Sequence, residues 1–305
     1  MKKFISFILI LISSLFIFGC QETSDKIDII AVSFSDYEFT KQVVGELDYY
    51  SVHYLLANGQ DAHSYQATFK DKMLFSKAKM VVYSGGDSTA WIDDLLSNDC
   101  KKVKYSEFLT PICLDGHDNE ESEEHDHLVD EHYYLSIKNA ITITNKIVNV
   151  LSQTDQMHSR IFAENGNLFI RNLQQLDSEY ESLKESKNAN VVVADRQPFS
   201  YLFNDYGINC FSAFKGCSTE IDCSFETIVN LANKLNEYNL NHILVTENGS
   251  LDIANSVISQ SKKQNVQILR LNSMQSIKQK DNMSYIDICY ENLSVLKTCL
   301  GVNNG

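Results

Sequence analysis

The sequence predicts an α/β protein of two lobes, each a mostly parallel sheet flanked by helices. Short β-rich runs alternate with helical segments in residues 27–96 and again in residues 190–300, which is typical of parallel β-α-β units. Between these stretches, apolar residues recur at helical spacing from Ile137 to Leu151. We therefore expect one long rigid helix to join the lobes, and a ligand cleft between them near the carboxyl ends of the strands.

Each predicted element follows from composition and local spacing. In the first half, Gly45 ends the first helix and Gly85 and Gly86 close the third strand. In the middle, Thr154-Asp155 supplies an N-cap for a second helix. The strands are expected at 27–34, 49–55, 80–83, 190–194, 208–211, 242–246 and 266–271, and the helices at 35–44, 70–78, 91–96, 137–151, 225–238, 251–262 and 285–300.

The chain divides into four predicted parts. These are a lipoprotein signal peptide at 1–19, an N-terminal lobe at 20–134, a linking helix at 135–155 and a C-terminal lobe at 156–305. The first lobe contains a surface loop at 115–131 that is rich in acid and histidine and has no apolar period.

The first twenty residues predict export and lipid anchoring. Lys2 and Lys3 precede an uncharged apolar run that ends in Gly19-Cys20, the order of a secretory signal with a small-residue cleavage site. The alternative, a transmembrane helix, would need a longer apolar run. A small residue before cysteine resembles a bacterial lipobox, which would make Cys20 the lipidated N-terminus; ordinary secretion with a free Cys20 is the other interpretation.

Net charge and cysteine spacing exclude some classes of partner and of metal site. The formal net charge of −14 argues against nucleic acid and against an anionic membrane surface as partners, and it suits cation capture. Eight cysteines include no C-x-x-C pair, which disfavours a thiolate zinc knuckle. Outside the cytoplasm they can form structural disulfides or remain buried thiols, and the sequence does not determine the pairing.

Three residues at the ends of predicted elements can bind a metal together. His63 follows a strand, His132 precedes the long helix, and Glu247 follows the strand at 242–246. Neutral imidazoles and a carboxylate are an ordinary ligand set for zinc. For each residue alone, a surface or satisfied polar role is the simpler interpretation, so the hypothesis depends on all three.

The loop supplies a second signal. His117, His125 and His127 lie among six acidic residues, and such a run is ordinarily a solvated segment. Histidine-rich tracts also bind metals, so we interpret the loop as an auxiliary, low-affinity metal collector.

The ordered segments together resemble the metal-binding class of ABC-transporter substrate-binding proteins, the zinc and manganese uptake lipoproteins. The similarity runs from about Ile27 to Leu300. The matching segments are 32–34, 45–46, 61–65, 70–71, 84–86, 91–92, 130–136, 284–286 and 292–296. The resemblance implies two lobes bridged by one long helix, with the metal buried between them.

The resemblance also implies ligand roles for His63 and His132, and it matches Glu247 to the acidic ligand of the second lobe. One position departs from the pattern, because Arg196 stands where the family commonly has a third histidine. Arginine has no lone pair to offer a cation. Water, Asp195 or a loop histidine would have to complete the shell, and Arg196 would be placed to pair with Glu247 or another acid.

The predicted function is capture of a divalent transition metal, Zn2+ first and Mn2+ as the alternative, for an ABC importer permease. The protein is expected to be a monomer anchored by its N-terminal lipid to the outer face of the cell membrane. A surface metal-buffering or adhesin lipoprotein is the rival of another class. A secreted metalloenzyme ranks below both, because the sequence contains no H-E-x-x-H helix or nucleophile motif.

Overall fold

The computed structural model describes residues 26–114, 129–216 and 223–302, which form two four-stranded parallel sheets. The strand orders are β2-β1-β3-β4 and β6-β5-β7-β8. The first sheet contains β1 (Ile27–Ala31), β2 (Tyr50–Tyr54), β3 (Met80–Tyr83) and β4 (Lys101–Lys104); the second contains β5 (Asn190–Val193), β6 (Asn209–Ser212), β7 (His242–Thr246) and β8 (Gln267–Leu271). The predicted fold class, two parallel α/β lobes, is therefore confirmed.

The central strands explain why both sheets form. β1 pairs in parallel with β2 on one side and β3 on the other, and Ile29, Ile30 and Ala31 are fully buried. Near-continuous apolar runs are expected for strands covered on both faces. The edge strand β4 escaped prediction because its sequence is Lys-Lys-Val-Lys and only Val103 is buried.

The helices cover these sheets and begin at capping residues. α2 begins after Ser33, whose hydroxyl accepts from the backbone N–H of Asp36 while the Asp36 carboxylate accepts from the N–H of Ser33. The helices are α2 (Phe34–Val44), α3 (Phe69–Phe75), α4 (Ile137–Thr154), α5 (Ser159–Tyr180), α6 (Ser200–Asp205), α7 (Phe225–Glu237), α8 (Asp252–Gln260) and α9 (Tyr285–Leu300).

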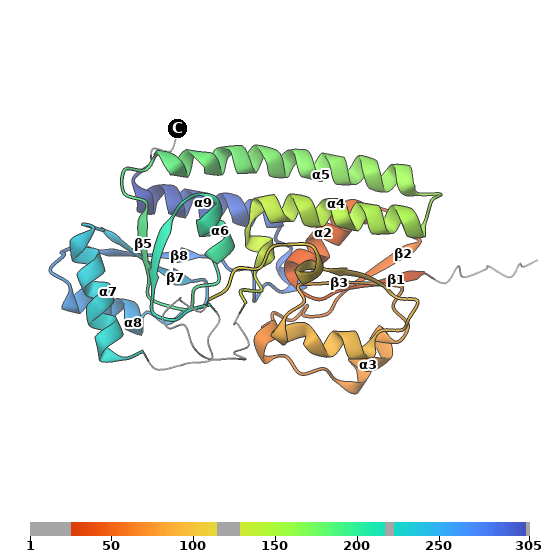
Figure 1. Cartoon of the computed structure of the whole chain (residues 1–305), viewed down its shortest axis with the longest axis horizontal. Coiled ribbons are helices and arrows are strands. Elements are labelled where there is room, and N and C mark those ends of the chain that lie inside the picture. The colour runs from red at the N-terminus through yellow and green to blue at the C-terminus, as the bar shows by residue number, and fades with distance from the viewer. Residues whose placement is uncertain (1–25, 115–128, 217–222, 303–305) are drawn as a thin grey trace, which may run out of the picture.

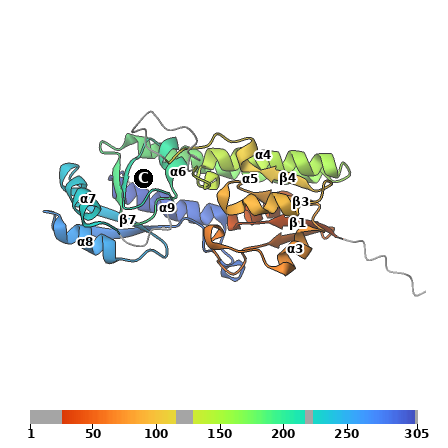
Figure 2. The same ribbon diagram turned by 60° about the horizontal axis from the view of Figure 1, so that its bottom comes forward.

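The chain passes from one lobe to the other along α5. α4 lies over the first lobe, reverses at Asp155, and is followed by α5, which runs the length of the molecule (Figures 1 and 2). This differs from the linking helix predicted at 135–155, because the break at 154–155 is a tight hairpin turn. Asp155 holds that turn, accepting hydrogen bonds from Tyr50 at 2.8 Å and His158 at 2.6 Å.

α9 makes a second connection along the same face. It lies beside α5 in Figure 1, and the hydroxyl of Tyr180 donates to the carbonyl of Cys289 at 2.6 Å. At its start, Tyr285 packs edge-on against Phe39 of α2 and donates to the carbonyl of Tyr134 at 2.6 Å. Two long helices therefore tie the lobes together and restrict their relative motion.

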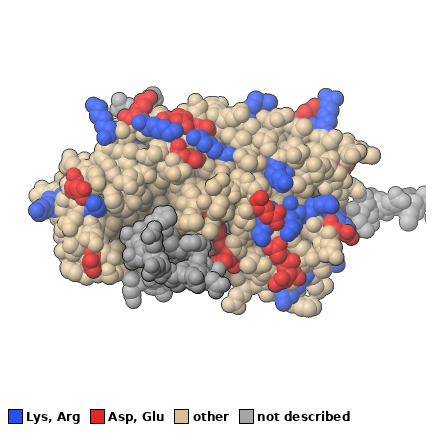
Figure 3. Space-filling view, viewed as in Figure 1, with Lys and Arg blue, Asp and Glu red and all other residues tan. Residues whose placement is uncertain are grey.

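Four remaining features are the absence of a membrane-spanning helix among the described residues, the surface charge, the state of the cysteines and the N-terminal segment. None of the helices in the described residues is both long and apolar enough to cross a bilayer. Acidic and basic side chains are interspersed on the face shown in Figure 3. The cysteines at 100, 113, 210, 223, 289 and 299 carry free thiols. The signal peptide at 1–19 and Cys20 lie outside the described residues.

Candidate metal centre

His63 lies in a 3₁₀ turn, Ala62–Ser64, that follows β2. The Asp61 carboxylate begins this turn by accepting from the backbone N–H of His63 at 2.9 Å. The residue is exposed, so its imidazole can be reached from solvent. The local fold thus presents one nitrogen ligand at the mouth of the site.

His132 is the deep partner, and only 3% of its surface is exposed. Its backbone N–H and its Nδ1 both donate to Oδ1 of Asp130, at 2.9 and 2.7 Å. Burial alone would raise the pKa of Asp130, but its hydrogen bonds and its electrostatic attraction to His132 outweigh burial and hold that pKa below its usual value. An ionised carboxylate keeps the proton on Nδ1, which leaves the Nε2 lone pair for a metal.

The two imidazoles face one another across a small cavity. Their Nε2 atoms are 3.3 Å apart, and the ring centroids are 5.3 Å apart. Two histidine nitrogens that each bind one tetrahedral zinc ion at about 2.0–2.1 Å would be separated by roughly 3.3 Å. The cavity encloses about 40 Å³, so it suits an ion rather than an organic molecule. The structure therefore brings together the two histidines that the sequence singled out.

Gln275, after β8, is the second-lobe residue that lines this cavity. Its side-chain amide nitrogen donates to Nε2 of His132 at 2.9 Å, and its Oε1 accepts from the Ser273 hydroxyl at 3.0 Å. Sequence reasoning missed Gln275 because a glutamine in a loop carries no signal of metal binding. Its place directly after a parallel strand is the one cue that could have found it.

Glu247 has a different position from the one the sequence suggested. Its carboxylate accepts from the backbone N–H and hydroxyl of Ser273, at 2.8 and 2.9 Å, and from Ser276 at 3.2 Å. It does not line the histidine cavity described above. Glu247 therefore anchors the loop that carries Gln275, and a direct ligand role for it stays a prediction.

Arg196 and Asp195 do not complete the shell in this structure. The Asp195 carboxylate accepts from the backbone N–H of Thr246 at 3.0 Å and from its hydroxyl at 2.5 Å, so it connects β5 to β7. Among the described residues, Arg196 forms no ion pair, and the suggested pairing with Glu247 is absent. Arg196, which has no lone pair, therefore supplies no ligand here.

The cavity therefore holds fewer metal ligands than a tetrahedral zinc site needs. Within residues 26–114, 129–216 and 223–302, no three His, Cys, Asp or Glu side chains lie together so as to hold one metal ion. The two imidazoles fit zinc, whereas the Gln275 amide presents its nitrogen to His132 and its oxygen to Ser273. The loop histidines His117, His125 and His127 lie outside the described residues, and their role stays a prediction.

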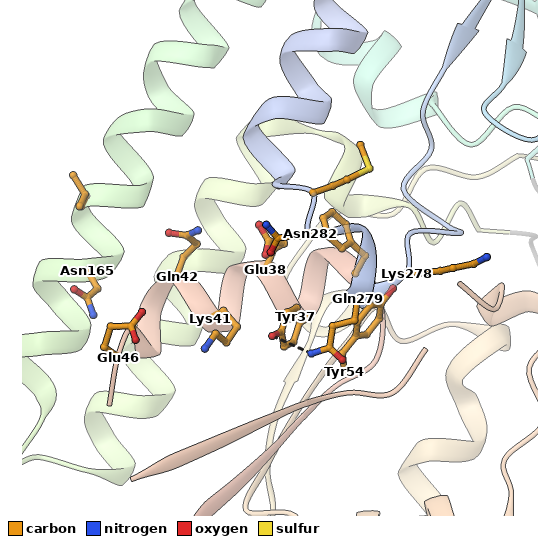
Figure 4. Close-up of a pocket in the computed structure, with 14 residues that line it drawn as sticks. Tyr37, Glu38, Lys41, Gln42, Glu46, Tyr54, Asn165, Lys278, Gln279 and Asn282 are labelled. Carbon is orange, nitrogen blue, oxygen red and sulfur yellow. Dashed lines mark hydrogen bonds between the residues drawn. The ribbon is translucent and has the colours of Figure 1, made fainter. Parts of the chain in front are cut away.

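A larger cavity lies elsewhere, between α2, α5 and the segment before α9 (Figure 4). It measures about 600 Å³, and the charged residues that line it are of both signs: Glu38, Glu46, Lys41 and Lys278. No histidine or cysteine lines it. Its chemistry therefore gives no preference for a transition metal, and the smaller histidine cavity remains the candidate site.

Two parallel-sheet lobes tied by long helices, with an ion-sized cavity between them, define a two-lobe substrate-binding protein. Residues 30–299 match the family model described as ZnuA, zinc-uptake complex component A, periplasmic, and the chain belongs to this family.

Individual relatives agree with this assignment. The zinc-binding lipoprotein AdcA of Streptococcus pneumoniae is 30% identical over 312 residues, which cover 97% of this chain and 61% of AdcA. The chain thus spans about three fifths of the length of that relative. The high-affinity zinc uptake system protein ZnuA of Bacillus subtilis is 24% identical, over 94% of this chain and 91% of its own.

Solved structures show the same similarity in three dimensions. The Zn(II)-bound ZnuA-like domain of Streptococcus pneumoniae AdcA superimposes with a TM-score of 0.72 and 26% identity, over 90% of this chain and 99% of that domain. The laminin-binding protein Lmb of Streptococcus agalactiae, described as having adhesin and metal-transporting activity, has a TM-score of 0.75 at 21% identity and shares the fold.

Proposed function

We propose that this protein captures a divalent transition metal, Zn2+ in preference to Mn2+, and delivers it to an ABC importer. The observation that carries the proposal is the 3.3 Å spacing of the His63 and His132 Nε2 atoms in an ion-sized cavity. Imidazole ligands favour zinc, whereas manganese prefers oxygen-rich shells. The zinc-binding names of the relatives support the same cargo.

The cargo is held between lobes, with His63 and His132 on one side and Gln275 on the other. Glu247 holds the Gln275 loop through Ser273, and the Tyr134 hydroxyl donates to the carbonyl of Ser273 at 3.1 Å. Binding would therefore join parts of both lobes around the ion. Because α5 and α9 both cross between the lobes, we expect a small shearing movement on binding rather than a wide hinge opening.

The remaining parts of the proposal concern location and partners. Cys20 is the proposed lipidation site, which would hold the protein at the outer face of the cell membrane. There it is proposed to act as a monomer and to meet a permease. The lipoprotein name of AdcA supports this placement. The proposed role is transport rather than catalysis, since the relatives are named for metal binding and uptake. Palmitate labelling that is lost in Cys20→Ala would test the anchor.

Metal competition binding tests the function. The full-length chain, purified in mild detergent, is titrated with Zn2+ and with Mn2+ against a chromogenic chelator. A His117→Ala/His125→Ala/His127→Ala background removes the loop histidines. We expect one tight zinc site, and we expect His63→Ala to weaken it by about 100-fold, as loss of a direct ligand does. Preference for Mn2+, or equal zinc affinity in His63→Ala, would overturn the assignment.

A further inference from the structure

We propose that Glu131 supplies the negative charge that balances the bound metal ion in this protein. This inference rests on the proposed function. It starts from the charge balance of the site. The imidazoles and the Gln275 amide are neutral, and the ionised Asp130 carboxylate contacts the Nδ1 side of His132 and does not line the cavity. Placing an ion in such a site without an anionic partner is costly. A carboxylate is therefore expected at the same cavity.

Glu131 lines the histidine cavity and is 8% exposed. It directly precedes His132, so any movement of that segment carries the two side chains together. Its Oε1 accepts from the backbone N–H of Ser88 at 3.0 Å, and its Oε2 accepts from the Ser88 hydroxyl. Both contacts are from neutral donors, and no cation among the described residues forms an ion pair with Glu131.

The other carboxylates at the cavity have local explanations. Asp36 belongs to the capping box of α2 and also accepts from the Tyr105 hydroxyl. Asp61 caps the 3₁₀ turn that carries His63 and is partly exposed, so solvent screens its charge. Glu131 is buried beside His132 and lines the cavity itself, and its contacts are to Ser88 in the first turn of the 3₁₀ helix Asp87–Leu95.

A second cavity supports the same role, because Glu131 lines it too. This outer cavity, of about 400 Å³, is also lined by Asp87, Asp93 and Lys104. Pro111 and Val129, which flank the acidic histidine-rich segment in the sequence, belong to its lining. Glu131 thus lines both the outer cavity and the histidine cavity, so its charge acts on cations in either one.

The backbone is built to accommodate this carboxylate. Gly86 lies against it, and a Cβ at residue 86 would fall 2.5 Å from the carboxyl carbon and from Oε1 of Glu131. Glu131 also fixes Ser88, so a purely structural role is the competing explanation. The two roles predict opposite orders of affinity among substitutions at residue 131.

The test uses the full-length chain in detergent, in the background lacking the loop histidines, with zinc competition against a chelator. Glu131→Gln preserves the shape and removes the charge: its amide oxygen can accept from the Ser88 N–H, and its amide nitrogen can donate to the Ser88 hydroxyl oxygen in place of the bond accepted by the carboxylate. Glu131→Asp keeps the charge on a shorter side chain. If Glu131 balances the metal, Glu131→Gln binds zinc at least about tenfold more weakly and Glu131→Asp recovers part of the loss. A structural role gives the reverse order, with Gln equal to the parent and Asp weaker.

Matched controls separate the possible failures. Glu107→Gln removes the same charge from the first lobe at a residue outside both cavities, where the side chain is 53% exposed, and it should bind zinc within about threefold of the parent.

If the parent binds zinc and His63→Ala does not, but Glu131→Gln equals the parent, the role proposed for Glu131 is wrong and the proposed function stands. If the parent fails to bind zinc, the proposed function fails. If Glu131→Gln is unfolded in the absence of metal, Glu131→Asp and Glu131→Asn are compared instead. The uncharged Asn variant is then expected to bind zinc about tenfold more weakly than the Asp variant.

Discussion

Asp130 and His132 form a buried pair in which the histidine Nδ1 donates to the carboxylate at 2.7 Å. The contact determines which ring nitrogen is available, because Nε2 alone faces His63 and Gln275. The second oxygen of Asp130, Oδ2, is buried without a hydrogen-bond partner. The carboxylate therefore acts on the site chiefly through the imidazole.

Asp130→Asn should weaken zinc binding by about 10- to 100-fold, which is the usual cost of losing the partner of a metal-bound histidine. The amide can still accept from Nδ1, but it no longer stabilises positive charge on the ring. Chelator competition measures the change. An unchanged affinity would mean that His132 is oriented by packing alone.

Gln275→Glu should strengthen zinc binding by about tenfold or more, because it adds a carboxylate ligand beside two neutral imidazoles. Gln279→Glu adds the same charge in the same segment, where Gln279 contacts Tyr37 rather than the histidines, and it serves as the control. Weaker zinc binding in Gln275→Glu would show that the amide contact to His132 matters more than the added charge.

Gly86→Ala should displace the Glu131 carboxylate, since the new methyl group would overlap it at 2.5 Å. We expect a loss of about 1–3 kcal/mol in unfolding free energy, as for overpacking elsewhere in proteins, and weaker zinc binding as well. Urea unfolding without metal and chelator competition measure the two effects separately. A stable variant with parental zinc affinity would contradict the tight seating of Glu131.

Asp36 makes stability depend on pH. Burial raises the pKa of its carboxyl from 3.8 to about 6, against the opposing hydrogen bonds from Tyr105 and Ser33. Between these two values the folded state holds more protons than the unfolded state, so unfolding free energy falls as pH rises through this window. The contribution is complete below pH 3.8 and lost above about pH 6, and it amounts to about 3 kcal/mol.

Asp36→Asn removes this titration. Urea unfolding at intervals from pH 4 to pH 7 should show the wild-type protein losing stability relative to the variant as pH rises. Parallel pH profiles for the two proteins would contradict the assignment.

Much of the fold was predictable because it depends on local patterns. The apolar run of β1 and the Ser33 cap of α2 are visible in the sequence. β4 was missed, because its lysines face solvent at a sheet edge and only Val103 gives an apolar signal. The crossing along α5 was missed for another reason: helical periodicity shows that two helices are separated at Asp155 but not that the chain reverses there.

The sequence by itself determined the alternation of strands and helices, the capping residues, and the choice of His63 and His132 as candidate ligands. Only the tertiary structure decided which second-lobe residue meets them. Glu247 and Gln275 both follow neighbouring parallel strands, β7 and β8, and so emerge at the same sheet edge. Composition favoured the glutamate, but the backbone path of each loop directs the glutamate carboxylate to Ser273 and the glutamine amide to His132. The alternation of residues along a strand specifies the face of the sheet on which each side chain lies. It does not specify where a side chain points in the loop that follows the strand.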